Sequence, residues 1–584
     1  LVIMNSVNIF EKLNFIDVLL ILIRRNDHIY FIKSNFTSKF FSFFRVKKII
    51  KLKWNLIDLE NDNQKIITKI IEDHEVDKNV YKILNFLNEK IKLENNFVHY
   101  LIKYLSNNKV IGNFSIENFL VLIKASNILF KNKKKIFFLE STEINDFIKE
   151  NYENGNLLFV FKRSFFDLQN LKNFFIILKN FKYVFYKFKV DRTKKKSIAV
   201  MDSFEINKPQ EFFNLKEFSD KIIFLSNDNN YNASDIINVY HYIDLNIIIT
   251  TFKELFNNNQ KFKNFKLLRS LYTNFYFQKL IFKKIFKIYH IKKFVSSHIA
   301  QVFTSSGIAA IHELNGKSFG YTMSFCEKYS SHLNIDAFDY FISFNNSIYK
   351  KIEKSNLKLI KEIGYIGDYK FKKKFVEGDE IKKNFKEKGV NYVIGFFDQG
   401  YSKDSMFNVH YDVSKKGYEF LLNKIISHKD MGLIIKPKKP RFLREKLGTI
   451  YDLLIEAQKT GRVILFDKHS SYHSKNFEDT PAKVASASNI SIHDTLLAGT
   501  AGLESALTGA KSVFFDYYNA RKSQFDNDDL KIVFRDWNSL WEEILKDCKY
   551  GNQSLGNWTG IIDKFDMIRD GKANLRIMNF LNKD

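Results

Sequence analysis

The stretch SIHDTLLAGTAGLESALTGAKSVFFD, residues 491–516, has the order of a short strand, a polar loop, a helix and a second buried strand. Gly499, Thr500, Ala501 and Gly502 are small, so a ligand can approach their backbone closely. The helix that they open offers first-turn N–H groups and a positive dipole end, which suit a phosphate. An ordinary loop–helix–strand unit has the same pattern, so the rest of the chain must decide.

Two other side chains of this stretch suit a phosphorylated ligand. Glu504 falls in the first turn of the expected helix, where its carboxylate can reach a sugar hydroxyl beside the phosphate. His493 ends the strand that leads into the loop. Gly509 is the expected stop of the helix.

The same alternation of strands and helices fills the last 200 residues and predicts a doubly wound parallel sheet. The expected strands are 392–397, 432–435, 463–466, 490–492, 513–515 and 532–534. The expected helices between them are 414–427, 443–459, 481–487, 503–507 and 539–546.

The first half of the chain alternates in the same way, with a helical stretch at 65–130. A strand at 246–250 and a small polar turn at 304–307 are also expected. The other strands are expected at 18–23, 28–32, 48–52, 136–139, 157–161, 197–201, 221–225, 318–323 and 339–344, with helices at 37–44, 142–152 and 347–354. The predicted fold class is α/β, with two Rossmann-like doubly wound domains facing across a cleft and extra helices in the N-terminal half.

Three domain ranges follow from this pattern. Residues 1–375 are predicted to form the first Rossmann-like domain, and residues 385–550 the second. A lysine-rich segment at 370–388 reads as a linker or exposed helix, and 551–584 as a helical tail.

Bulk composition limits the class of protein. The 584 residues carry a net charge of +27, from 92 Lys and Arg against 65 Asp and Glu. Such a charge fits nucleic acid, an anionic membrane or phosphorylated substrates, although abundant lysine on solvated faces also accounts for much of it. Cys326 and Cys548 are the only cysteines, which fits a reducing cytoplasm. No apolar run is long enough to span a membrane, and no signal peptide is recognised.

Three segments together resemble the donor-binding domain of GT-B glycosyltransferases. They are LIIKP at 433–437, PAKVASASNI at 481–490, and the loop and helix at 493–509 with the ending Glu-x-Ala-x-x-Gly. The resemblance is to bacterial surface-polysaccharide and CDP-glycerol glycerophosphotransferase-like proteins. It implies that 385–550 is the domain that binds the nucleotide-sugar donor and 1–375 the acceptor-side domain. It also implies that Lys436 and His493 belong to the donor site.

The resemblance also assigns roles within the last segment. It implies that Gly499, Thr500, Ala501 and Gly502 lie near the donor diphosphate and that Glu504 contacts the ribose. Related proteins often have a histidine where Lys438 stands, so a histidine contact to phosphate is not expected there. The specific match covers about the last 200 residues, with weaker similarity from about residue 295.

An inverting transfer needs a base for the acceptor hydroxyl and stabilisation of the leaving diphosphate. The candidates for the base are His298, His312, Glu313 and Glu327. Weaker candidates are His332, Asp202 and Glu205. No Asp-x-Asp motif follows a strand, so neither a metal nor a cofactor is expected, and the nucleotide-sugar is a substrate.

The resulting hypothesis is a cytoplasmic transferase that moves a sugar from a nucleotide-sugar to a cell-envelope glycan or lipid-linked acceptor, as in capsule or lipopolysaccharide synthesis. Peripheral contact with an anionic inner membrane face fits the charge, whereas dispersed basic residues argue against nucleic acid. The alternatives are a CDP-glycerol-type polyol-phosphate transferase, a nucleotide-sugar 2-epimerase and a non-catalytic scaffold of envelope polysaccharide assembly.

Overall fold

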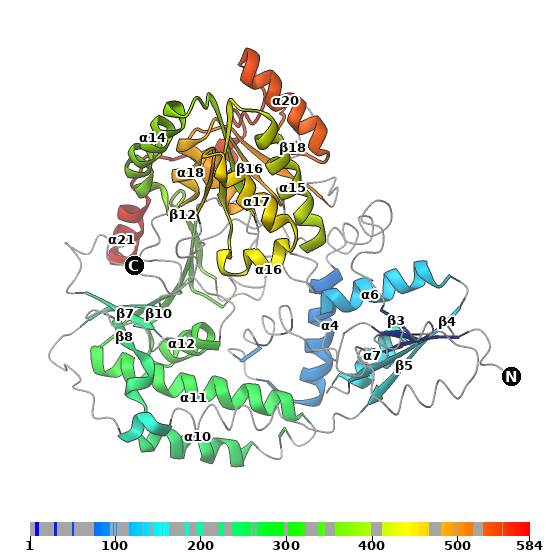
Figure 1. Cartoon of the computed structure of the whole chain (residues 1–584). Helices are drawn as coiled ribbons and strands as arrows, with labels where there is room; N and C mark the ends of the chain where they lie inside the picture. Colours follow the sequence, from blue (N-terminus) through cyan, green and yellow to red (C-terminus); the bar gives the residue numbers. More distant parts are fainter. Residues whose placement is uncertain are drawn as a thin grey trace. The chain divides into compact units, whose positions relative to one another are not determined.

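The chain is described from a computed structural model and consists of two compact units (Figure 1). Unit 1 comprises Leu1–Val190, Tyr240–Ile285 and Ile299–Ala310, and unit 2 comprises Asp191–Val239, Phe286–His298 and Ile311–Asp584. The structure describes residues 6–10, 29–31, 49–51, 75–93, 97–98, 101, 105, 116–131, 133–140, 144–154, 156–162, 181–185, 196–201, 221–226, 236–258, 261–262, 265–296, 302–321, 337–344, 357–398, 411–466, 480–496, 499–517, 530–551 and 553–583.

Unit 1 contains a parallel sheet of five strands in the order β3-β2-β1-β4-β5. Phe137 and Phe159 are partners across β4 and β5, and their rings stack 5.5 Å apart, which joins the two strands on one face. The strands are β1 (Ser6–Phe10), β2 (Ile29–Phe31), β3 (Ile49–Lys51), β4 (Lys134–Glu140) and β5 (Leu157–Lys162). The helices that accompany them are α4 (Glu75–Lys90), α6 (Ile116–Leu129) and α7 (Asn145–Tyr152).

These elements confirm the expected strands at 28–32, 48–52, 136–139 and 157–161 and the helix at 142–152. The predicted segments 18–23, 37–44 and 347–354 lie outside the described residues. The five-stranded sheet is an addition to the two doubly wound sheets that the sequence pattern predicts.

Two predictions for unit 1 are wrong. Residues 246–250 are not a strand but the start of helix α10 (Leu245–Asn257), because the Asp244 carboxylate accepts from Ile247 N at 2.8 Å and caps the helix. Residues 304–307 are not a turn but part of helix α12 (Val302–His312). The small residue Ser306 is buried there, and its hydroxyl donates to the carbonyl of Phe275 in helix α11 (Lys266–Tyr289).

The first sheet of unit 2 has seven parallel strands in the order β12-β11-β10-β9-β6-β7-β8. The chain runs outward from β6 to β8, returns to β9 beside β6, and runs outward again, so the switch point lies between β6 and β9. The strands are β6 (Ile198–Met201), β7 (Ile222–Ser226), β8 (Ile236–Asn238), β9 (Lys293–Ser296), β10 (Lys317–Tyr321), β11 (Tyr340–Ser343) and β12 (Leu359–Glu362). They confirm the expected strands at 197–201, 221–225, 318–323 and 339–344.

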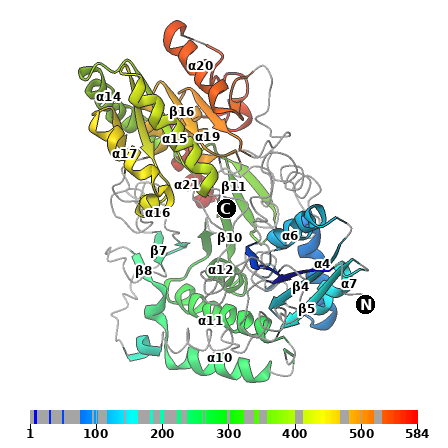
Figure 2. The same cartoon turned by 45° about the vertical axis from the view of Figure 1, so that its right-hand side comes forward.

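The second sheet of unit 2 has six parallel strands in the order β15-β14-β13-β16-β17-β18 (Figure 2). Its switch point lies between β13 and β16, next to the stretch at 491–516. The strands are β13 (Tyr392–Phe397), β14 (Met431–Lys436), β15 (Val463–Leu465), β16 (Ile490–His493), β17 (Ser512–Phe515) and β18 (Val533–Phe534). The helices are α15 (Tyr411–Ser427), α16 (Leu443–Leu447), α17 (Ile450–Lys459), α18 (Pro481–Ala487), α19 (Thr500–Leu507) and α20 (Trp537–Tyr550).

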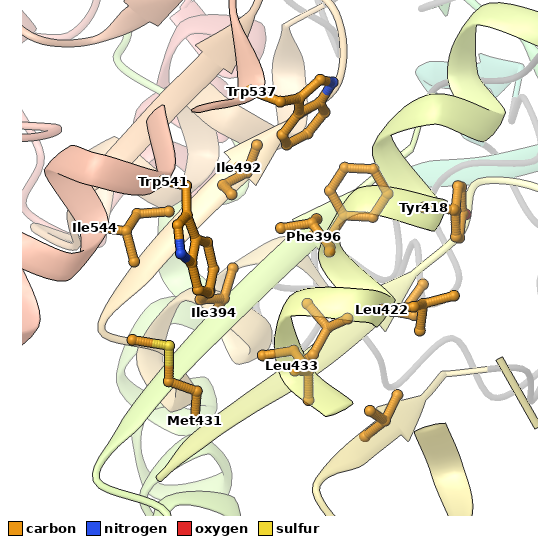
Figure 3. Close-up of a cluster of buried hydrophobic side chains, with 14 of the residues drawn as sticks. Ile394, Phe396, Tyr418, Leu422, Met431, Leu433, Ile492, Trp537, Trp541 and Ile544 are labelled. Carbon is orange, nitrogen blue, oxygen red and sulfur yellow. The ribbon is translucent and has the colours of Figure 1, made fainter. Parts of the chain in front are cut away.

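All six strands that the last 200 residues predict are therefore present, and both sheets of unit 2 are doubly wound. One face of the second sheet is closed by a cluster of buried side chains (Figure 3). Phe396 of the central strand is fully buried, and Trp537 of α20 stacks on Phe515 at 4.1 Å. Truncating a buried aromatic of this kind to Ala costs about 3–5 kcal/mol, so this cluster holds the sheet edges in place.

The end of the chain returns to the first sheet of unit 2. Helix α21 (Ala573–Lys583) places Ile577, Met578 and Leu581 in the cluster that covers this sheet. The lysine-rich segment after β12 is helix α14 (Phe371–Glu387). Among the described residues, no helix has the length and apolar character needed to cross a membrane.

Candidate functional site

The candidate site lies at the carboxyl edge of the six-stranded sheet of unit 2. Because its strands are parallel, they bring their last residues to one edge, and Phe397 of β13 pairs with both Lys436 of β14 and His493 of β16. Helix α19 begins just beyond β16. Ligands of doubly wound sheets bind at this edge, next to the switch point.

The start of α19 has the backbone expected of a phosphate cradle. Its N-cap is Gly499, which provides no capping side chain. Packing also requires glycine at positions 499 and 502. A Cβ would lie 2.7 Å from the Phe514 ring at Gly499 and 2.5 Å from it at Gly502. The helix therefore approaches β17 more closely than any larger residue permits, and Thr500 and Ala501 form its first turn.

His493 is buried beside this turn. It is 1% exposed and lies between the rings of Phe397 and Phe514, with centroids 6.4 and 5.8 Å away. Burial, together with the nearby charge of Lys438, lowers the pKa of His493 to about 3, so the imidazole is neutral at pH 7. No described residue makes a hydrogen bond with its Nδ1. A buried nitrogen without a hydrogen-bond partner is unfavourable by about 1–3 kcal/mol.

Asp398 fixes the turn that follows β14. Its Oδ1 accepts from the backbone N–H of Lys438 at 2.6 Å, and its Oδ2 accepts from the Tyr418 hydroxyl and from Lys446 Nζ. Asp398 and Lys446 are both buried, with side chains 2% and 4% exposed. This carboxylate therefore has a structural role that holds the Lys438 backbone at the edge.

The charge balance around Lys446 is negative. Burial lowers the pKa of Lys446, and the carboxylates of Asp398 and Asp494 oppose that shift. Asp494 is fully buried and accepts from the Ser414 hydroxyl at 3.3 Å. Two buried carboxylates thus face one buried ammonium beneath the candidate site.

Glu504 is held by two protein donors. Its Oε1 accepts from the backbone N–H of Ala482 at 2.9 Å, at the start of α18, and its Oε2 accepts from the Tyr365 hydroxyl at 2.8 Å. Burial raises the pKa of Glu504, and these two hydrogen bonds oppose the shift, as does the charge of Lys436. A carboxylate has about four acceptor positions, so two remain for sugar hydroxyls.

The histidine predicted as a base lies in different surroundings. His312 ends α12, and its Nε2 is 2.9 Å from Asp339 Oδ2 and 3.0 Å from Ser318 Oγ. Ser318 also donates its N–H to Asp339 at 2.8 Å. Because both partners contact the same ring nitrogen, this is not the arrangement of a catalytic triad.

The cluster of His312 lies at the amino ends of β10 and β11, opposite the edge where such sheets bind ligands. Although burial alone would raise it, the pKa of Asp339 is held well below its usual range by His312 and by the Ser318 N–H. Glu313 is exposed at the end of the same helix. His298 and Glu327 lie outside the described residues, as do His332, Asp202 and Glu205.

The structure thus brings together the predicted donor-site residues Lys436, His493, Glu504 and the first turn of α19. It adds Tyr365 and Lys446, which the sequence motifs did not single out. Tyr365 could have been noticed because it follows the strand β12 between two glycines, whereas nothing in the local sequence marks Lys446. Among the described residues, no three His, Cys, Asp or Glu side chains come together in a way that could hold a metal.

No protein-family model and no curated protein matches the sequence. Solved structures that match include the wall teichoic acid polymerase TagF, at 13% identity and a TM-score of 0.41 over 72% of this chain and 98% of that one. A UDP-GlcNAc 2-epimerase from Neisseria meningitidis matches at 12% identity and a TM-score of 0.41, over 67% of this chain and 100% of that one. A glycosyltransferase from Rickettsia africae matches at 14% identity and a TM-score of 0.38, over 67% of this chain and 99% of that one. At these scores, the assignment of the fold rests on the parallel sheets described above.

Proposed function

We propose that the six-stranded sheet of unit 2 binds a nucleotide-sugar and that the protein transfers its sugar to a cell-envelope glycan or lipid-linked acceptor. One observation supports this above the others. A buried, neutral His493 with an unpartnered Nδ1 lies beside the first turn of α19, at the switch point of a doubly wound sheet. A diphosphate oxygen is a suitable partner for both groups.

The chemistry needs stabilisation of the leaving nucleoside diphosphate rather than a metal. The dipole of α19 and the charges of Lys436 and Lys438 provide positive potential at the edge where that charge develops. Glu504 retains acceptor positions for the ribose hydroxyls. A metal-independent transfer is the mechanism that these groups support.

For the base, the candidates remain His298, His312, Glu313 and Glu327. We expect His312 to affect stability rather than turnover, because its side chain is bonded to Asp339 and Ser318. Replacing each of the four by Ala, once a donor is known, separates them: only a base lowers kcat while leaving donor affinity unchanged.

Three other functions would use the same donor site. A CDP-glycerol-type polyol-phosphate transferase would release CMP, a 2-epimerase would need no acceptor, and a scaffold protein would bind without turnover. Product analysis after incubation with a bound donor and a glycan or lipid acceptor fraction distinguishes them. Sugar transfer from a nucleoside-diphosphate sugar releases the nucleoside diphosphate, glycerol-phosphate transfer releases CMP, epimerisation yields the epimeric nucleotide-sugar, and a scaffold leaves the donor unchanged. We place the protein in the cytoplasm, with peripheral contact at an anionic inner membrane face in capsule or lipopolysaccharide synthesis.

The first test is thermal shift with UDP-, CDP-, GDP- and CMP-linked sugars. Binding stabilises the native state by RT ln(1 + [L]/Kd), so at least one donor should raise the melting temperature, and the shift should grow with the logarithm of the donor concentration above Kd. If none of them shifts the transition at millimolar concentration, the transferase proposal fails.

The second test uses Glu504→Ala with Glu377→Ala as its control. Glu377 is a partly buried carboxylate that pairs with Lys374 and Lys483. Lys483 follows Ala482, which donates to Glu504, but Glu377 does not lie in the first turn of α19. We expect Glu504→Ala to weaken donor binding about tenfold or more, and Glu377→Ala to leave it unchanged. Equal affinities in the two variants would exclude the ribose contact.

A further inference from the structure

Helix α10 of unit 1 exposes a continuous apolar stripe. Leu245, Ile249 and Phe256 are 53%, 43% and 69% exposed. Their spacing of four and seven residues places them on one face of the helix, while Ile248 on the other face is buried. The helix is therefore apolar on both the side that packs against the unit and the side that faces solvent.

The orientation of α10 is fixed by contacts at both ends. At its start, the N-cap Asp244 forms an ion pair with Lys284 of α11 at 2.6 Å. Near its end, Glu254 accepts from the Tyr272 hydroxyl of α11 at 3.2 Å. The two helices are thus antiparallel neighbours, as both views show (Figures 1 and 2). The stripe is held outward and cannot turn into the core.

Such a stripe occurs once in the part of the chain that the structure describes. No other helix in that part has three large apolar side chains that are more than 40% exposed. Exposed apolar residues elsewhere, such as Val376, Tyr550 and Met567, are not aligned in threes on one helix. Contiguous exposed apolar surface of this kind marks an interaction site more often than scattered residues do.

The charge around the stripe is positive. Residues 244–287 contain nine Lys or Arg and two acidic residues, a net charge of 9 − 2 = +7. Both acidic residues are engaged by neighbouring side chains, Asp244 by Lys284 and Glu254 by Tyr272. Lys253 is exposed one turn after Ile249, on the flank of the stripe. An apolar face accompanied by the exposed Lys253 and Lys261 fits a surface that is apolar inside and anionic at its edge.

We propose that the exposed face of α10 lies on an anionic lipid bilayer, with Leu245, Ile249 and Phe256 inserted at the level of the acyl boundary. The exposed Lys253 and Lys261 then face the lipid phosphates. Amphipathic helices bind bilayers in this way, through buried apolar area together with attraction to anionic lipids. The proposal concerns unit 1 and does not depend on the donor site.

Binding is measured by sedimentation with vesicles of phosphatidylcholine containing 30% phosphatidylglycerol, at about 0.15 M salt, against vesicles of phosphatidylcholine alone. The triple variant Leu245→Gln, Ile249→Gln and Phe256→Gln changes exposed helix positions to a good helix former, so the fold is retained. We expect its partition onto anionic vesicles to fall about tenfold or more.

Two matched sets complete the experiment. Val376→Gln, Tyr550→Gln and Met567→Gln remove as many exposed apolar side chains from unit 2 and should leave vesicle binding unchanged. Lys253→Gln with Lys261→Gln should lower binding to anionic vesicles about tenfold and have little effect on the neutral ones.

The proposal is overturned by a failure of vesicle binding or by a result that assigns the stripe to self-association. The first outcome is that the wild-type protein does not sediment with anionic vesicles, or that the triple Gln variant sediments as well as the unit 2 control set. The other is that light scattering shows the triple variant to lose self-association while its vesicle binding is unchanged, in which case the stripe is an interface between copies of the chain. Thermal shift with nucleotides should be the same in all these variants.

Discussion

Two histidines of unit 2 lie at opposite kinds of sheet edge. His493 ends β16 at the carboxyl edge, is buried and neutral, and has an Nδ1 without a partner among the described residues. His312 lies at the amino ends of β10 and β11, where Asp339 and Ser318 contact its Nε2. The sequence offers both as candidates. The two differ in the sheet edge where they lie and in their partners: His493 Nδ1 has no partner among the described residues, whereas His312 is bonded within the fold.

The largest expected effect tests the frame beneath His493. Asp398→Ala leaves the buried ammonium of Lys446 without its closest partner, and breaking such a pair costs about 3–5 kcal/mol. Urea unfolding followed by the fluorescence of the buried Trp537 and Trp541 measures this loss. The double variant Asp398→Ala with Lys446→Met should recover much of it. A loss below about 1 kcal/mol in the single variant would mean that the pair does not hold the edge.

A scan of the free energy of unfolding against pH tests the burial of His493. The folded pKa of His493 is lowered to about 3 from 6.5, so its contribution is present above pH 6.5 and is lost as the pH falls toward 3. At pH 4.5 the loss approaches about 3 kcal/mol, at 1.36 kcal/mol for each of two pH units. Asp339 keeps its contribution in this window, because its folded pKa lies well below its usual range.

The free energy of unfolding of the variant His493→Phe should therefore depend less on pH between 4.5 and 6.5 than that of the wild type. An unchanged slope in His493→Phe would show that His493 titrates normally and is not buried as described.

The expected effects on donor binding are smaller, and they should appear in the His493 variant and not in the His312 variant. If Nδ1 of His493 contacts a donor phosphate, His493→Phe should weaken binding about tenfold, the value of one hydrogen bond to a charged group. Conversely, His312→Ala should lower the free energy of unfolding by about 1–3 kcal/mol and leave donor affinity unchanged. Titration calorimetry and urea unfolding of both variants test this. Equal loss of affinity in both would contradict the assignment of the two edges.

The smallest effect concerns Tyr365, whose hydroxyl donates to Glu504. Tyr365→Phe removes one hydrogen bond to a carboxylate that we expect to bind the ribose, so donor affinity should change by a factor of about three to ten. Tyr369→Phe is the control on the same segment. If both variants bind the donor with the same affinity as the wild type, Tyr365 does not position Glu504.

Local pattern was sufficient to predict most of unit 2. Each of its sheets is built from short apolar runs such as 392–397, which are buried on both faces and therefore read clearly as parallel strands. The small residues at the start of α19 predict a close backbone approach, and their place after a strand of the second α/β domain favours a phosphate site over an ordinary loop. The structure shows that Gly499 and Gly502 also serve packing against Phe514, a reason that only the fold reveals.

The wrong predictions, and the residue that was missed, lie where tertiary contacts determine the secondary structure or the role of a side chain. Residues 246–250 have the composition of a strand, but Asp244 caps a helix there and α11 provides the surface on which it packs. Residues 304–307 look like a turn, yet their small size lets α12 pack closely on α11. Lys446 could not be found from sequence because its role depends on Asp398, 48 residues away.

The most direct test of the central claim is an experimental structure of the protein with a bound nucleotide-sugar. The account predicts that the diphosphate lies at the first turn of α19, with one of its oxygens within hydrogen-bond distance of His493 Nδ1. A diphosphate bound elsewhere, with the first turn of α19 and His493 Nδ1 left without contact to it, would contradict the account.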